Sequence, residues 1–171
     1  MTHQNMTIPT SIQLQNRSKL FDFVLSQRPD HTEITIQFYT NYYTTNEIPE
    51  TISLLESTLP RIFKHKCFNN GNLAFKKEAA NTELGHLFEH ILLEFLCIYK
   101  FKEGQLDFNL KGLTEWNWLQ DPRGIFYISL NTTKEDTLLL QQAILQTKRL
   151  METILQTNTS HSERLTEVHT A

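Results

Sequence analysis

The sequence predicts a single α+β domain in which a mostly antiparallel sheet packs against helices. Three observations favour this class. Strand-like and helix-like segments alternate irregularly along the chain, unlike the regular order of a doubly wound sheet. The length of 171 residues is sufficient for one hydrophobic core. One central segment is apolar on nearly all sides, which indicates a buried helix that the other elements surround.

Alternation and β-branched residues identify the strands, and longer amphipathic or apolar runs identify the helices. The expected strands are residues 11–15, 20–25, 33–39, 106–110 and 124–130. The expected helices are residues 46–59, 81–101 and 134–155. The strand at 33–39 has the clearest alternation.

Proline and glycine mark several boundaries of these elements. Pro49 fits the first turn of the helix at 46–59, and Pro60 interrupts that helix. Residues 68–72 form a turn cluster around Gly71. A long loop, residues 114–124, separates the last two strands.

The domain is expected to span residues 11–155. Residues 1–10 are polar and predicted to be flexible. Residues 156–171 are polar and predicted to be a disordered tail.

The most informative motif is His86-Leu87-Phe88-Glu89-His90. On a helix two histidines four residues apart point the same way, so both can bind one zinc ion. Glu89 lies one turn beyond His86, close enough to take a proton from a metal-bound water. This H-x-x-E-H order is that of the inverted zinc peptidases. It predicts a zinc-dependent hydrolase.

The helix that carries the motif supports this interpretation. At about 100° per residue, His86, Glu89, His90 and Glu94 fall in one arc narrower than half the helix. The rest of the circumference is apolar. Burying these four polar groups is costly unless they are paired or bound to metal, and one metal ion accounts for all of them.

A hydrolytic zinc site needs a third protein ligand and an open position for water. We expect Glu94, one turn past His90, to be that ligand. Glu115 and Asp121, in the downstream loop, are the alternatives.

Composition excludes several other functions. The net charge is −3 and basic residues are scattered, so no nucleic-acid partner is expected. No apolar run is long enough to cross a membrane, and the N-terminus lacks a signal-peptide core. We therefore expect a cytoplasmic protein with Cys67 and Cys97 reduced. The sequence carries no signal for an oligomeric state.

The residues around the motif resemble the N-terminal domain of cyanophycin synthetase. The similar positions are Leu59-Pro60, His65-x-Cys67, Gly71, Phe75 and Thr82-x-Leu84-Gly85-His86-x-x-Glu89-His90-x-x-Leu93-Glu94, then Thr114 and Pro122-Arg123-Gly124-Ile125-Phe126-Tyr127. The likeness covers roughly residues 11–155. Two features depart from the family: residues 68–72 replace its proline-glycine-rich turn, and its ATP-grasp and ligase domains are absent.

The resemblance implies a free-standing version of this domain, with cyanophycin, a polymer of aspartate and arginine, as the candidate substrate. His86, Glu89, His90 and Glu94 match the positions that would cut an amide or isopeptide bond. Arg123 and Trp116 are expected to contact the substrate. His65 and Cys67 also match the family. We expect a structural role near the site for them, and the alternative is a metal role, because the pair offers nitrogen and sulfur. The competing hypothesis is a non-catalytic module that binds a polymer or a protein.

Overall fold

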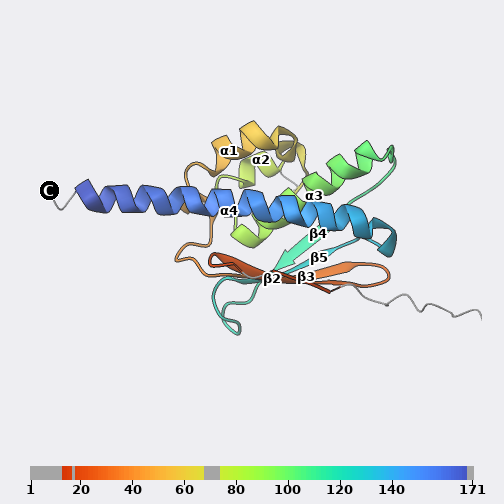
Figure 1. Cartoon of the computed structure of the whole chain (residues 1–171), viewed down its shortest axis with the longest axis horizontal. Helices are drawn as coiled ribbons and strands as arrows, with labels where there is room; N and C mark the ends of the chain where they lie inside the picture. The colour runs from red at the N-terminus through yellow and green to blue at the C-terminus, as the bar shows by residue number, and fades with distance from the viewer. Residues whose placement is uncertain (1–12, 17, 68–73, 169–171) are drawn as a thin grey trace, which may run out of the picture.

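A five-stranded antiparallel sheet carries the helices on one of its faces (Figure 1). The protein is described here by a computed structural model that covers residues 13–16, 18–67 and 74–168, with side chains of the last helix through Thr157. The strands are β1 (Gln13–Asn16), β2 (Phe21–Gln27), β3 (Thr32–Phe38), β4 (Gly112–Glu115) and β5 (Ile125–Leu130). Their order in the sheet is β1-β2-β3-β5-β4, so β1 and β4 are the edges.

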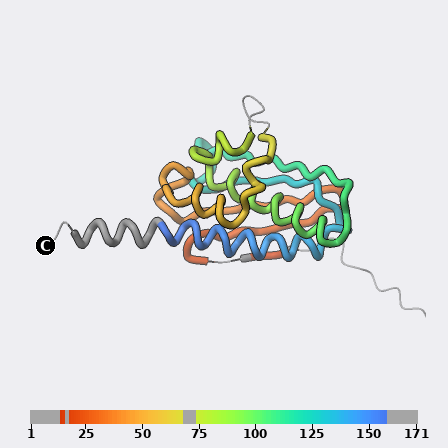
Figure 2. Tube along the Cα trace, turned by 90° about the horizontal axis from the view of Figure 1, so that it is seen from above, coloured from red at the N-terminus to blue at the C-terminus, as the bar shows by residue number. Residues whose placement is uncertain are grey.

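Four α-helices and three short 3₁₀ segments complete the described part of the chain. The helices are α1 (Thr51–Thr58), α2 (Phe75–Glu78), α3 (Leu84–Lys102) and α4 (Thr137–Val168). The 3₁₀ segments are η1 (Thr45–Glu47), η2 (Pro60–Lys64) and η3 (Lys134–Asp136). Helix α4 runs alongside α3 over the sheet (Figures 1 and 2).

Side-chain alternation gives the sheet one buried face and one accessible face. On β2, for example, Phe21, Phe23 and Leu25 are buried, and the residues between them are partly exposed. Phe88 of α3 lies against this surface, with its ring centroid 6.3 Å from that of Phe21 and 6.1 Å from that of Phe23. The core is therefore the layer between the sheet and α3.

Helix α3 is enclosed more fully than the other helices. Every residue from Leu84 to Glu94 is buried, including four with polar side chains. One side of the helix contacts β5 and another contacts α4. The polar stripe therefore faces the remaining neighbours, η2, α2 and β4.

The predicted α+β class, the antiparallel sheet and the central position of the motif helix are confirmed. The predicted strand at 106–110 is wrong, because the edge strand is β4 at Gly112–Glu115. Pairing decides this: Gly112 stands opposite Leu130 and Glu115 opposite Tyr127, in register with β5. Glycine has low strand propensity, so local sequence gives no hint of the pairing.

Two other elements differ from expectation. Helix α2 has only four residues and no helical periodicity, so the sequence did not predict it. Helix α4 continues to Val168, beyond the end predicted at residue 155. The domain boundaries stay predictions, and residues 68–72 lie outside the described part of the chain. Among the described residues, none of the helices has the length and apolarity that crossing a membrane requires.

A glycine permits the contact between α3 and the sheet. A Cβ atom on Gly85 would overlap Cβ, Cγ and Cδ1 of Phe126 on β5. Because Cβ of Phe126 is fixed by its own backbone, rotation of the ring cannot relieve the overlap. The residue immediately before His86 therefore sets how closely α3 approaches the sheet.

Gly85→Ala is expected to lower the free energy of unfolding by about 1–3 kcal/mol through overpacking. Helix propensity alone would give the opposite sign, a gain of about 1 kcal/mol. Urea denaturation measures the change. Phe126→Ala removes Cγ and Cδ1, two of the three overlapping atoms, so the two substitutions combined should cost less than the sum of their separate effects. A Gly85→Ala variant as stable as the wild type would contradict the close packing.

Candidate metal centre

Three metal-ligating side chains converge beside the buried stripe of α3. His86 and His90 come from α3, and Cys67 comes from the segment after η2. The Sγ atom of Cys67 lies 3.2 Å from Nε2 of His86 and 3.5 Å from Nε2 of His90, and the two Nε2 atoms are 3.1 Å apart. The three residues are 2%, 6% and 3% exposed, respectively. This Cys67–His86–His90 group could hold a metal ion.

The spacing of the three atoms suits a small tetrahedral ion. At zinc bond lengths of about 2.0 Å to nitrogen and 2.3 Å to sulfur, tetrahedral geometry separates two nitrogens by about 3.3 Å and nitrogen from sulfur by about 3.5 Å. The observed separations are within a few tenths of an ångström of these values. The donor set, one sulfur and two imidazole nitrogens, is one that zinc accepts.

Neighbouring side chains hold the other nitrogen of each imidazole. Nδ1 of His86 lies 2.7 Å from the hydroxyl oxygen of Thr82. Nδ1 of His90 lies 3.1 Å from Nδ1 of His65, whose Nε2 is 2.8 Å from Oε2 of Glu94. These contacts orient both rings so that their Nε2 atoms point to Cys67. Such outer contacts normally fix ring orientation around a metal.

Stacking and burial also prepare the two imidazoles for binding. The ring of Phe75, on α2, stacks on His90 with centroids 3.8 Å apart and meets His86 edge-on. Burial lowers the pKa of His90 to about 2, with a further contribution from the imidazoles of His86 and His65. Burial likewise lowers the pKa of His86. Both rings are therefore neutral near pH 7, the form that binds metal.

Glu89 lies on the same helix but is held by the edge strand of the sheet. Its Oε2 atom accepts a hydrogen bond of 2.5 Å from the hydroxyl of Thr114. A Cβ atom on Gly112 would overlap the Glu89 carboxylate, so β4 approaches it closely. Burial raises the pKa of Glu89 to about 7, although the hydrogen bond from Thr114 opposes the shift. A carboxyl with such a pKa exchanges protons readily near neutral pH.

A cavity of about 670 Å³ joins these groups. It lies between the segment around Cys67, the polar side of α3 and the strand β4. The Cys67–His86–His90 group and Glu89 line it, together with Trp116, which is 38% exposed. The candidate metal ligands and the candidate base therefore border one volume that a small molecule or chain segment could enter.

The other predicted ligands make different contacts and are not members of this group. Glu94 contacts His65, with the Arg61 guanidinium 3.9 Å away, so its assignment as third ligand stays a prediction. Glu115 alternates with Thr114 on β4, so its side chain is on the opposite face of the sheet. Asp121 interacts with the side chain of Tyr127.

The two residues expected to contact the substrate, Trp116 and Arg123, lie in different surroundings. Trp116 lines the cavity. Arg123 lies over the rings of Tyr43 and Trp118, 5.3 and 5.5 Å from their centroids, an arrangement that anchors the loop. Cys67 belongs to the group that could hold an ion, which favours the alternative metal role over the structural role expected for it. In the sequence only the pair His65-x-Cys67 indicates a metal ligand here. This pair has no periodicity from which a contact between Cys67 and α3 could be predicted.

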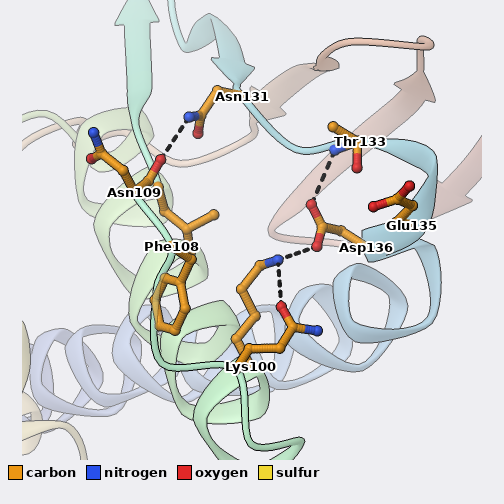
Figure 3. A pocket seen from close by; sticks show the side chains of 9 residues that line it. Lys100, Phe108, Asn109, Asn131, Thr133, Glu135 and Asp136 are labelled. Atoms are coloured by element: carbon orange, nitrogen blue, oxygen red, sulfur yellow. Dashed lines mark hydrogen bonds and ion pairs between the residues drawn. The ribbon is translucent and has the colours of Figure 1, made fainter.

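A second cavity, of about 350 Å³, lies at the other end of α3 (Figure 3). Lys100 lines this cavity, and the Lys100 ammonium group lies between Asp136 and the side-chain oxygen of Gln105. The second carboxylate oxygen of Asp136 accepts a hydrogen bond from the Thr133 amide. These groups satisfy one another, so they tie α3 to the start of α4 and offer little to a ligand.

Comparison with known proteins agrees with the resemblance noted in the sequence. Residues 33–111 match the family model described as the cyanophycin synthase-like N-terminal domain. The matched segment includes the Cys67–His86–His90 group, Glu89, His65 and Glu94. No curated protein and no solved structure matches the chain.

Cobalt binding should identify the ligands. The wild type is expected to bind one Co²⁺ with a sulfur-to-metal absorption band, because Cys67 supplies a thiolate. Cys67→Ser should remove that band, and His86→Ala or His90→Ala should abolish binding. Glu94→Gln should retain both the ion and the band. If Glu94→Gln loses the ion while Cys67→Ser keeps it, the Cys67–His86–His90 group is not the site.

Thr82→Val should weaken zinc binding about 10–100-fold, because it removes the partner that fixes the ring of His86. Competition with a chromophoric chelator measures the affinity. Thr147→Val, at another buried threonine whose hydroxyl donates to the Ala143 carbonyl, is the matched control. Equal zinc affinities for the two variants would show that the Thr82 contact does not act on the site.

Proposed function

We propose that this chain, which contains a cyanophycin synthase-like N-terminal domain over residues 33–111, is a zinc-dependent hydrolase of amide or isopeptide bonds. The observation that carries the proposal is the shared cavity. The Cys67–His86–His90 group and Glu89 line the same volume, so an ion, a water molecule and a base can meet there. A zinc site with three protein ligands keeps a fourth position for chemistry.

Cys67, His86 and His90 would hold the ion through Sγ and the two Nε2 atoms. Bound zinc supplies Lewis acidity, which lowers the pKa of water and polarises a carbonyl oxygen. Thr82 and His65 keep the imidazole rings oriented, and Glu94 holds His65.

Glu89 would act as the proton carrier. Its carboxylate takes a proton from a water molecule in the cavity as the water oxygen attacks the carbonyl carbon of the substrate. The carbon–nitrogen bond then breaks, and Glu89 returns the proton to the leaving amine. Thr114 holds the carboxylate through its hydrogen bond, and the absence of a side chain at Gly112 leaves room for it.

The family match suggests the substrate class. We infer that the chain acts on a polymer of aspartate and arginine such as cyanophycin, with Trp116 at the wall of the cavity contacting it. A cytoplasmic location is part of the proposal, because a reducing compartment keeps the Cys67 thiol available as a ligand.

Two alternatives use the same residues. Sulfur and imidazole ligands also form structural zinc sites, and the low exposure of the three ligands favours that possibility. A non-catalytic module would bind the polymer in the cavity without cutting it. The cavity beside the ligands favours the catalytic proposal over the structural one.

Glu89→Gln distinguishes these possibilities. A hydrolase should keep its fold and zinc but lose about 10²–10⁴-fold in turnover, the usual contribution of a general base. The assay is release of dipeptides or shorter chains from cyanophycin, identified by mass spectrometry. Wild-type protein that holds zinc and leaves the polymer intact would contradict the catalytic proposal. Polymer retained on the protein would then favour a binding module.

A further inference from the structure

The strand β4 lies at the edge of the sheet and also forms a wall of the cavity. It is the last strand in the order β1-β2-β3-β5-β4, so among the described strands only β5 pairs with it. Residues 108–114 and Trp116 line the cavity. An unpaired strand edge presents backbone N–H and C=O groups to any extended chain that reaches it.

The register identifies which backbone groups of β4 are free. In an antiparallel pair, opposed residues alternate between hydrogen-bonded and non-hydrogen-bonded pairs. The amide of Asn131 donates to the Lys111 carbonyl, so this pair is hydrogen-bonded. By this alternation, the pairs Leu113–Ser129 and Glu115–Tyr127 are hydrogen-bonded as well. The N–H and C=O groups of Gly112 and Thr114 therefore point away from β5.

These two residues are also the ones that contact Glu89. The Thr114 hydroxyl donates to its carboxylate, and Gly112 packs against it. A chain paired with the free edge of β4 would therefore lie next to the candidate base. Because strand side chains alternate, every second residue of that chain would face the cavity.

The charges around the cavity indicate what kind of chain it accepts. Lys66 and Lys111 line the cavity and are exposed. Among the described residues, neither ammonium group has an ion-pair partner. Among the described lining residues the acidic side chain is Glu89, which is buried. The accessible charge is thus positive, which favours a ligand that carries carboxylates.

We propose that the free edge of β4, at Gly112 and Thr114, binds an extended acidic peptide as an added strand, with Lys66 and Lys111 contacting its carboxylates. Main-chain pairing of this kind gives affinity while alternate side chains give specificity. The inference rests on the proposed function, because it names the substrate class of the same site. Binding is nevertheless measured separately from turnover.

The test uses the full chain and a hexa-aspartate peptide blocked at both ends. In NMR spectra the peptide should shift the amides of Gly112 and Thr114 and slow their exchange with solvent. The amides of Leu113 and Glu115, already paired with β5, should keep their exchange rates. Two further probes carry N-methyl groups, one on alternate amides and one on every amide. The first keeps one unmethylated edge and should bind as before, whereas the second should lose at least about tenfold in affinity.

Charge is tested with a matched pair of variants. Lys66→Gln combined with Lys111→Gln should weaken binding of hexa-aspartate at least about fivefold. Lys19→Gln, near the opposite edge of the sheet, should leave it unchanged.

Several outcomes would overturn the inference. These are no binding at millimolar peptide, equal binding of both N-methylated probes, or binding that leaves the Gly112 and Thr114 amides unaffected. Concentration-dependent dimerisation through β4 would also overturn it, because a second copy would then occupy the edge. Cleavage of cyanophycin without edge pairing removes only this inference. Edge pairing without cleavage contradicts only the hydrolase.

Discussion

The enclosure of α3 is the constraint on which the rest of the structure depends. A helix buried from Leu84 to Glu94 must satisfy every polar group it takes into the interior. The sheet and α4 offer apolar surfaces, so the polar stripe can only be satisfied from the third side. Three elements distant in sequence meet there: the segment after η2 brings His65 and Cys67, α2 brings Phe75, and β4 brings Thr114. The site is thus a consequence of how the core is closed.

Two buried polar clusters beside α3 illustrate different solutions to this constraint. Lys100 and Asp136 neutralise each other, and neighbouring groups complete their hydrogen bonds. That cluster is self-contained and holds two helices together. Around His86 and His90, in contrast, three ligand atoms crowd together, and the Cys67 thiol donates a hydrogen bond of 3.2 Å to the Glu78 carboxylate. Neutral imidazoles and a thiol tolerate such crowding, but a cation would satisfy them better.

Features of the fold that depend on local periodicity could be predicted from the sequence. Rotation about the helix axis placed His86, Glu89, His90 and Glu94 on one stripe of a buried helix, and alternation located β2, β3 and β5. Features that depend on contacts between distant segments were not accessible. Cys67 reaches His86 from 19 positions away, and no local pattern sets its direction. The edge strand was expected at 106–110 because leucine and phenylalanine occur there, whereas pairing with β5 and the space needed by Glu89 select a segment that begins at Gly112.

The wide separation of the ligands in sequence has a thermodynamic consequence. An ion bound by Cys67, His86 and His90 would cross-link a loop to a core helix, closing the intervening chain as a disulfide does. Its binding energy would then add to the folding energy. At a free metal concentration 100 times the dissociation constant, the linkage is about 2.7 kcal/mol. The thermal midpoint of this protein would thus depend on the metal concentration around it, and chelation would loosen the short helix α2, whose Phe75 ring stacks on His90.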